Sequence, residues 1–586
     1  MVKRAVLLLS VLLLVPICSI AQIPDVPTRK TIFQPHTAIN ISGITVNQKS
    51  EDENSWDNSI SASRKRALAF AGDSLPDWAA IYESYDLYPG HNLPLSVDNS
   101  GNIYVARLRS TRELGDRFFL LKYNPDGEEL WSREYYSSVK HGLKVDNILT
   151  DKNRNVYVVG SAGSLFKAVK YNPDGDLLWE TTTVDSSFYI LEAVASTLDN
   201  SNNLYITGSA FDEQYENDII TKKYNAEGVE QWSESYVQTH SKSGVPIDLG
   251  MDAIGNVYIG GWWSGRAITL KYDSDGNEEW RKVYDGIEHN RVNLPVMAVT
   301  PLGNIYLATS SSNLLIVLKY NADGVLKWTT VQEDSSRYAV IVKSIQVDAS
   351  GNSYVAGNAH YSSAGSRSNV VKFNNAGSIQ WVQDYQSTQK RLVQQNASTI
   401  FEVAATALDA QANLYVTGIG STADTGLDFV TVKYNAAGER QWSKRYNTME
   451  SSSQDFPRSI VVDPAGNIVL TGIFQGLYTY GIVTIKYSAS ENITNPDITS
   501  GFKVIQNYPN PFNNLTILRY QIPKKSHVRF AVYNIRGQQV AQLVDAVQPV
   551  GLYAVPFFGK ELPSGIYIAQ LSTGNVVKAR KFTLLK

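Results

Sequence analysis

The sequence predicts an all-β protein, an eight-bladed β-propeller followed by a small Ig-like β-sandwich. Aromatic residues make up 11% of the 586 residues, with 34 Tyr and 11 Trp, a composition typical of strands. The chain is too long for one core of about 100–200 residues, so several domains or a repeat array are expected. A ten-residue phrase recurs along most of the chain, and both the recurrence and the composition change after residue 488.

The repeat has two signatures. "KYNPDGEELW" at 122–131 returns as "KYNPDGDLLW" at 170–179. Its glycine and tryptophan recur at Gly127/Trp131, Gly175/Trp179, Gly228/Trp232, Gly276/Trp280, Gly324/Trp328, Gly377/Trp381 and Gly438/Trp442. A second phrase, "DNSGNIYV" at 98–105, returns at 348–357 and 463–472, with looser versions beginning at Asp151, Asp199, Asp252, Thr300 and Asp409. Asp, Asn and Gly favour tight hairpin turns, so each unit is interpreted as four short strands, the content of a propeller blade.

The two ends of the repeat predict a closed ring. The eighth unit, which contains Lys486-Tyr487, is not followed by a tryptophan strand, whereas "DWAAIYESYD" at 77–86 is a tryptophan strand without a unit of its own. We therefore expect the strand of Trp78 to complete the blade that begins near Ile460, which leaves no open edge. The alternative is seven blades, if the unit at Asp151 or Thr300 is irregular.

The repeated lysine and tryptophan of each unit are interpreted as structural. Each lysine precedes the same hairpin, and seven of the eight units have an Asp opening the other hairpin on the same face, which predicts pairing or turn capping. A large aromatic side chain at a fixed place in every unit predicts a wedge between neighbouring sheets.

Residues 76–488 resemble the secreted bacterial β-propeller repeat family through the "D..GN.YV.G" and "KYN..G...W" patterns. The resemblance implies the fold and says little about activity. The C-terminal residues 503–586 resemble the C-terminal sorting domain of type IX secretion substrates through "NYPNPFN", "VYNIRGQQV", "LPSGIYIAQL" and "RKFTLLK". That resemblance implies the type IX secretion machinery as a partner, passage through the outer membrane, and release from or attachment to the cell surface. Independently, alternation at Val528, Phe530 and Val532 predicts a small antiparallel sandwich.

The remaining segments predict targeting and connection. Residues 1–21 have the basic start, apolar run and small residues near the end that are typical of a secretory signal peptide, with cleavage after Ala21. Cleavage removes Cys18, the one cysteine, and leaves no predicted transmembrane segment. Residues 22–75 are expected to be a flexible lead-in and residues 489–502 a linker.

No cofactor, metal site or nucleic-acid partner is predicted. The formal net charge of −3 offers no basic field for nucleic acid. H-E-x-x-H, G-x-S-x-G and P-loop motifs are missing from the sequence, and "GIGSTA" at 418–423 is not followed by a helical pattern. "DSDGNEE" at 273–279 has the spacing of a calcium loop, but its sister units keep the hairpin without those ligands, which favours a turn.

Candidate binding residues lie in the variable connections. Both signature turns belong to one face of a propeller, so the connections that vary in length belong to the other face, where a rigid scaffold would present functional loops. The candidates on this face are Trp262, Trp263, Arg266, His289, His360 and Tyr361. In "GGWWSGRA" the two adjacent indoles should point to opposite sides of their strand, and an exposed indole beside Arg266 would suit a sugar ring. The alternative is that both indoles fill gaps between blades and that the histidines are ordinary loop residues.

The function predicted from these observations is a secreted or cell-surface binding and adhesion module, whose ligand is a glycan or an extracellular protein. The alternative is a secreted enzyme acting on extracellular polysaccharide, with acid and base residues on the variable face. Two carboxylates about 5–10 Å apart in a central depression would favour the enzyme. We predict no catalytic residues.

Overall fold

The computed structural model describes the chain from residue 76 to residue 585 with interruptions. The described residues are 76–84, 93–111, 115–137, 142–163, 165–183, 190–211, 217–236, 244–286, 292–361, 365–385, 401–422, 426–447, 454–475, 480–488, 501–508, 512, 515–548, 551–559, 562–574 and 576–585. The predicted signal peptide, the lead-in and nearly all of the predicted linker lie outside them. Every regular element within these ranges is a strand, which confirms the all-β prediction, and no helix among them is long and apolar enough to cross a membrane.

Within the described residues, β1 to β32 form eight sets of four antiparallel strands, which we number in chain order. Set 1 is β2 (Leu95–Val97), β3 (Ile103–Thr111), β4 (Gly115–Tyr123) and β5 (Glu129–Tyr136); set 2 is β6 (Leu143–Thr150), β7 (Val156–Ala162), β8 (Leu165–Tyr171) and β9 (Leu177–Thr182). Set 3 is β10 (Ile190–Leu198), β11 (Leu204–Phe211), β12 (Asn217–Tyr224) and β13 (Glu230–Tyr236); set 4 is β14 (Gly244–Met251), β15 (Val257–Trp263), β16 (Arg266–Tyr272) and β17 (Glu278–Tyr284).

The second half of the repeat continues this pattern. Set 5 is β18 (Val296–Val299), β19 (Ile305–Ser311), β20 (Leu314–Tyr320) and β21 (Leu326–Glu333); set 6 is β22 (Arg337–Val347), β23 (Ser353–Tyr361), β24 (Gly365–Phe373) and β25 (Ile379–Tyr385). Set 7 is β26 (Phe401–Leu408), β27 (Leu414–Thr422), β28 (Gly426–Tyr434) and β29 (Arg440–Tyr446); set 8 is β30 (Gln454–Val462), β31 (Ile468–Gln475), β32 (Tyr480–Tyr487) and β1 (Trp78–Ser84). A single parallel bridge between Leu427 and Gln454 joins sets 7 and 8 into one eight-stranded sheet.

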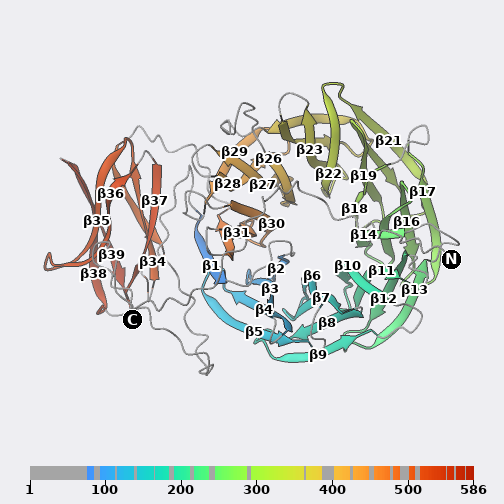
Figure 1. Cartoon of the computed structure of the whole chain (residues 1–586), viewed down its shortest axis with the longest axis horizontal. Helices are drawn as coiled ribbons and strands as arrows, with labels where there is room; N and C mark the ends of the chain where they lie inside the picture. The colour runs from blue at the N-terminus through green and yellow to red at the C-terminus, as the bar shows by residue number, and fades with distance from the viewer. Residues whose placement is uncertain are drawn as a thin grey trace, which may run out of the picture. The chain divides into compact units, whose positions relative to one another are not determined.

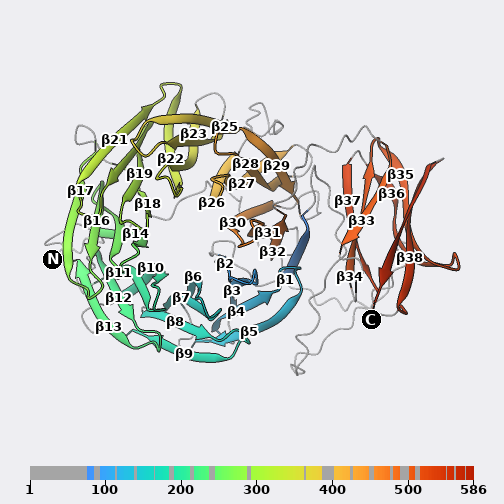
Figure 2. The same ribbon diagram turned by 180° about the vertical axis from the view of Figure 1, so that it is seen from behind.

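The first strand of each set is the inner strand, and the inner strands follow one another in a closed circuit (Figure 1). Each contacts the inner strand of the next set, and β30 of set 8 contacts β2 of set 1. Viewed from behind, the same inner strands surround the same centre (Figure 2). The buried clusters lie between successive sets: one, for example, joins Tyr157 of set 2 to Ile206 of set 3.

Strand β1 closes the circuit. It pairs antiparallel with β32 along its whole length, with Trp78 opposite Lys486, which confirms the predicted place of the Trp78 strand. Trp78 Nε1 and Lys486 Nζ both donate to the carbonyl oxygen of Pro125 in set 1, at 3.0 and 3.1 Å. The first and last sets are therefore held together by a tryptophan and a lysine that share one acceptor.

The same pair of hydrogen bonds, from a lysine and a tryptophan to one carbonyl, explains the repeated phrase. In set 1, Lys122 Nζ and Trp131 Nε1 donate to the carbonyl oxygen of Pro173 in the turn of set 2, at 2.7 and 3.0 Å. Four more sets place both groups on one carbonyl of the following turn: sets 2, 3, 6 and 8. The turn glycine has a positive φ and lies under the indole: a Cβ on Gly228 would stand 2.7 Å from Trp179. In these five sets the contacts confirm the structural interpretation of the lysine and the tryptophan.

The C-terminal residues form two further sheets around one core. One sheet is β33 (Lys503–Tyr508), β34 (Leu515–Ile522) and β37 (Gly551–Phe558); the other is β36 (Gln539–Gln548), β35 (Ser526–Asn534), β38 (Gly565–Thr573) and β39 (Val576–Leu584). Val528, Phe530 and Val532 alternate along β35 and are all fully buried in this core, as predicted. The core cluster consists only of residues 502–584 and those packed against it, so it is separate from the cores of the eight sets.

Candidate functional site

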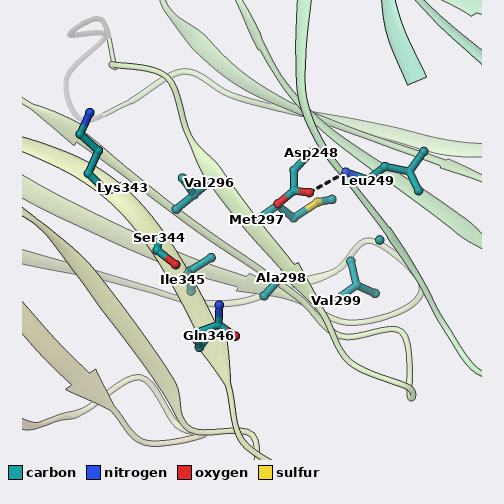
Figure 3. Close-up of a pocket in the computed structure, with 11 residues that line it drawn as sticks. Asp248, Leu249, Val296, Met297, Ala298, Val299, Lys343, Ser344, Ile345 and Gln346 are labelled. Atoms are coloured by element: carbon teal, nitrogen blue, oxygen red, sulfur yellow. Dashed lines mark hydrogen bonds between the residues drawn. The ribbon is translucent and has the colours of Figure 1, made fainter. Parts of the chain in front are cut away.

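A cavity of about 380 Å³ opens on the inner strands of sets 4, 5 and 6. Its lining comes from Asp248–Gly250 of β14, Val296–Val299 of β18 and Lys343–Gln346 of β22 (Figure 3). The lining residues are consecutive along each strand. Successive side chains of a strand point to opposite faces, so a consecutive lining means that each strand presents its edge to the cavity.

Local sequence makes room for this cavity. The middle strand, β18, is four residues long, whereas β14 has eight and β22 has eleven. Small residues also line it: Gly250 and Ala298. A Cβ on Gly250 would stand 2.5 Å from Cγ2 of Val299, so glycine allows β14 and β18 to approach each other here.

Asp248 is the one carboxylate among the lining residues. Its Oδ1 accepts the backbone N–H of Leu249 at 2.8 Å (Figure 3). Burial raises the pKa of Asp248 to about 6, and backbone hydrogen bonds from Leu249 and Met297 oppose that rise. Asp248 thus joins the inner strands of sets 4 and 5 and carries a charge that titrates near neutral pH.

The opposite wall comes from β22 and is polar. Ser344 Oγ lies 2.6 Å from Thr406 Oγ1, and Gln346 Nε2 donates to the Thr406 carbonyl at 3.4 Å, so both are tied to set 7. Lys343 is exposed, and it has no ion-pair partner among the described residues. The surface that the cavity exposes is therefore mostly polar, and Lys343 supplies one ammonium group to it.

The lining residues supply a single carboxylate, that of Asp248. A pair of carboxylates is needed for glycoside hydrolysis, and the eleven lining residues supply one. Nor do the described residues hold a group of three or more His, Cys, Asp or Glu side chains placed to bind a metal ion. What the cavity does offer is strand edges, a mostly polar surface and Lys343.

The two predicted tryptophans lie elsewhere, at the end of β15 in set 4. As expected, they point to opposite sides. Trp262 Nε1 donates to the Val292 carbonyl at 2.9 Å, just before set 5, whereas Trp263 packs against the buried cluster of sets 3 and 4. The Arg266 guanidinium lies 5.3 Å from the Trp263 ring centre and pairs with Asp285 at 2.9 Å. Both tryptophan residues are half-buried.

His360 and Tyr361 end β23 of set 6. His360 Nδ1 lies 2.7 Å from Ser366 Oγ, and Tyr361 donates to Asp384 Oδ2 at 3.3 Å. His289 lies outside the described residues. Set 5 separates this pair from Trp262 and Trp263, and no contact among the described residues joins the two groups, so ligand binding by the predicted residues stays a prediction.

The sequence did not predict the cavity, because the candidate residues were taken from the variable connections and not from the inner strands. The sequence does contain one signal, the residue four positions before the turn that follows each inner strand. In sets 1 to 8 this residue is Pro94, Asn147, Ala195, Asp248, Val296, Ser344, Ala405 and Ser459. The residue is polar in every second set, and each polar one bonds to the next set: Asn147 to Ser196, Asp248 to Met297, Ser344 to Thr406, and Ser459 to Leu93.

Comparison with known proteins identifies the C-terminal residues. Residues 506–584 match the family model described as "Secretion system C-terminal sorting domain", which confirms the predicted resemblance. The chain therefore carries a domain that directs export. No curated protein matches the chain.

Several solved structures are similar to the chain at low scores. PorZ, a surface component of the type IX secretion system of Porphyromonas gingivalis, is 12% identical with a TM-score of 0.31, covering 85% of this chain and 74% of PorZ. The WD40 domain of SCAP from fission yeast is 10% identical with a TM-score of 0.40, covering 72% and 98%. The polysaccharide lyase Uly1 is 12% identical with a TM-score of 0.37, covering 66% and 98%.

Proposed function

We propose that this protein is a secreted binding module: an eight-bladed β-propeller, exported by the type IX secretion machinery, that holds a glycan or an extracellular protein in the cavity between β14, β18 and β22. The observation that carries the proposal is the cavity itself, which presents strand edges and Lys343 around a single carboxylate. Ligand sites are commonly concave and combine apolar walls with a few placed polar groups.

The proposal includes the domain plan. The propeller spans residues 76–488, the linker 489–502, and the Ig-like sorting sandwich 503–586, after a signal peptide of residues 1–21 and a lead-in of residues 22–75. The match at 506–584 supports export through the type IX machinery. Delivery ends at the cell surface, with the protein either released or attached at the outer membrane.

The second candidate function is a secreted polysaccharide-degrading enzyme, and one observation favours it. The pKa of Asp248, raised to about 6, suits a general acid near neutral pH. A hydrolase would need a second carboxylate brought to the cavity, since the described lining residues supply none besides Asp248.

A glycan and matrix-protein array tests the proposal. The purified mature protein is applied with two variants of opposite expectation, Lys343→Glu in the cavity and Lys327→Glu on the exposed outer strand β21. We expect Lys343→Glu to weaken retention of the bound ligand by about tenfold, the scale of a lost interface charge, and Lys327→Glu to leave it unchanged.

Two further readouts separate the alternatives. Mass spectrometry of the recovered ligand reports cleavage, and cleavage that disappears in Asp248→Asn would favour the enzyme. If Trp263→Ala lowers retention at an unchanged melting temperature while Lys343→Glu does nothing, the site lies at the predicted tryptophans and not in the cavity.

A further inference from the structure

Two exposed aliphatic side chains lie on the turns that follow β14 and β18, two of the strands that line the cavity. Ile254 and Leu302 are each 82% exposed, the highest values among the large hydrophobic residues described. They occupy the same position of the D-x-x-G-N turn in sets 4 and 5. The other six sets place small or polar residues there: Ser100, Asn153, Ser201, Ser350, Gln411 and Ala465.

These two side chains lie just beyond two of the strands that line the cavity. The turn of Ile254 begins directly after β14, and the turn of Leu302 begins directly after β18. The backbone N–H of Ala253 donates to the Pro301 carbonyl at 2.9 Å, which holds the two turns side by side. The apolar pair therefore stands at the turn-side end of two strands whose edges line the cavity.

The edges that line the cavity offer backbone hydrogen bonds. β14, β18 and β22 are each the terminal strand of their sheet, so one edge of each has no strand partner within its own sheet. Such an edge can accept an added strand, whose main chain supplies affinity and whose side chains supply specificity. No aromatic side chain lines the cavity, so the flat surface on which a sugar ring stacks is missing from the described lining.

Lys343 adds a positive charge to the strand edges that line the cavity. Lys343 lines the β22 side, exposed and without a carboxylate partner among the described residues, while Ile254 and Leu302 stand at the β14 and β18 side. A ligand in the cavity meets the ammonium group of Lys343, and a ligand that continues along β14 and β18 to their turns reaches Ile254 and Leu302.

We propose that the cavity binds an extended peptide segment of another protein, with an aliphatic side chain of that segment on Ile254 and Leu302 and a carboxylate at Lys343. This inference rests on the proposed binding function and names its ligand class. Strand edges supply the main-chain contacts, the exposed pair selects a Leu, Ile or Val side chain, and Lys343 selects an Asp, a Glu or a free C-terminus.

A positional peptide library tests this inference. The mature wild-type protein is incubated with immobilised hexapeptides of random sequence, and the bound peptides are sequenced. We expect enrichment of aliphatic residues together with an acidic residue or a free C-terminus. Lys343→Glu should reverse the charge preference toward Lys and Arg, and the Ile254→Ser/Leu302→Ser double variant should abolish the aliphatic preference with about a tenfold loss of affinity.

Matched controls separate local effects from unfolding. Serine already occupies this turn position in sets 1, 3 and 6, so the double variant keeps turn chemistry that the protein uses elsewhere. Leu177→Ser/Leu178→Ser, on the outer strand β9, removes a similar exposed aliphatic pair far from β14 in the chain, and Lys327→Glu reverses an exposed charge on β21. Both controls should leave the selected peptides unchanged.

The outcomes distinguish the two proposals. If no peptide is enriched but a glycan is retained on the array and lost in Lys343→Glu, the peptide inference is wrong and the cavity remains a binding site. If peptides are enriched equally by the wild type and by the cavity variants, the cavity is not their site and the inference is overturned. If neither probe responds to the cavity variants, the proposed function falls as well.

Discussion

At the scale of the residue, Asp248 supplies the one carboxyl group among the residues that line the cavity. Its pKa is raised from 3.8 to about 6 because burial disfavours the charged form. Between these two values the folded protein binds more protons at this site than the unfolded chain does. The contribution of Asp248 to the free energy of unfolding therefore falls as pH rises through this window, and the full cost of the buried charge is present above pH 6.

Asp248→Asn should remove this pH dependence. At low pH the variant loses one backbone acceptor, a cost of about 1 kcal/mol. At pH 8 it also escapes the charge burial, so we expect its stability relative to wild type to improve by about 1–3 kcal/mol between pH 4 and pH 8. Calorimetric melting temperatures at both pH values measure this.

Asp174→Asn, at an exposed turn of set 2, is the control for a general charge effect. A relative stabilisation of the same size in both variants would show that net charge and not the buried carboxyl is responsible.

At the scale of the element, β1 depends on a distant part of the chain. Its partner, β32, begins at Tyr480, and its tryptophan is held by the turn of set 1. Loss of Trp78 removes the ring of a residue that is 8% exposed together with its hydrogen bond to Pro125, and such truncations cost about 3–5 kcal/mol.

Trp78→Ala should therefore release β1 while the other sets stay paired. We expect limited proteolysis to release an N-terminal fragment that contains β1, because the backbone pairing with β32 loses its anchor. Trp179→Ala is the matched control, since Trp179 makes the same bond to Ala226 from a strand that is continuous with its own set. Identical cleavage patterns in the two variants would argue against a special role of β1 in closure.

Two of the inner strands, β2 and β18, are short. In six sets a glycine of the second strand lies against the inner strand; a Cβ on Gly160 would stand 2.0 Å from the carbonyl oxygen of Lys144. Sets 1 and 5 have Arg107 and Thr309 at this position, and their inner strands, β2 and β18, are three and four residues long. Arg107 is buried with its guanidinium 3.6 Å from the Tyr82 ring centre.

At the scale of the whole molecule, the sorting domain and the candidate site belong to different cores. The C-terminal core contains residues 502–584 and none of the clusters of the eight sets. Deleting residues 503–586 should therefore leave the propeller folded but retain it in the periplasm, because the matched sorting domain is lost. Cell fractionation and surface proteolysis measure the location, and calorimetry of the retained protein checks its fold.

The full-length chain, fractionated in parallel, is the control for this deletion. Delivery of the truncated protein to the surface in the same proportion as the full-length chain would show that the address lies elsewhere.

The sequence by itself determined the repeat architecture. Turn residues such as Gly228 and the hydrogen-bonding pair of Lys122 and Trp131 recur at similar positions in each unit, because each unit contacts the next one through the same turn. The place of the Trp78 strand followed by counting, since a ring leaves no unit without its fourth strand. The sorting domain could also be read from its motifs, because they are local and specific.

Only the tertiary structure decided the candidate site. Asp248 and Lys343 are 95 positions apart in the sequence and line one cavity because β14 and β22 lie on either side of the short strand β18, whose length the repeat pattern does not reveal. The same holds for Trp262 and Trp263: their spacing showed that they diverge, whereas contacts with neighbouring sets decided that both are half-buried. Periodic signatures report what every unit shares, and a binding site arises where the units differ.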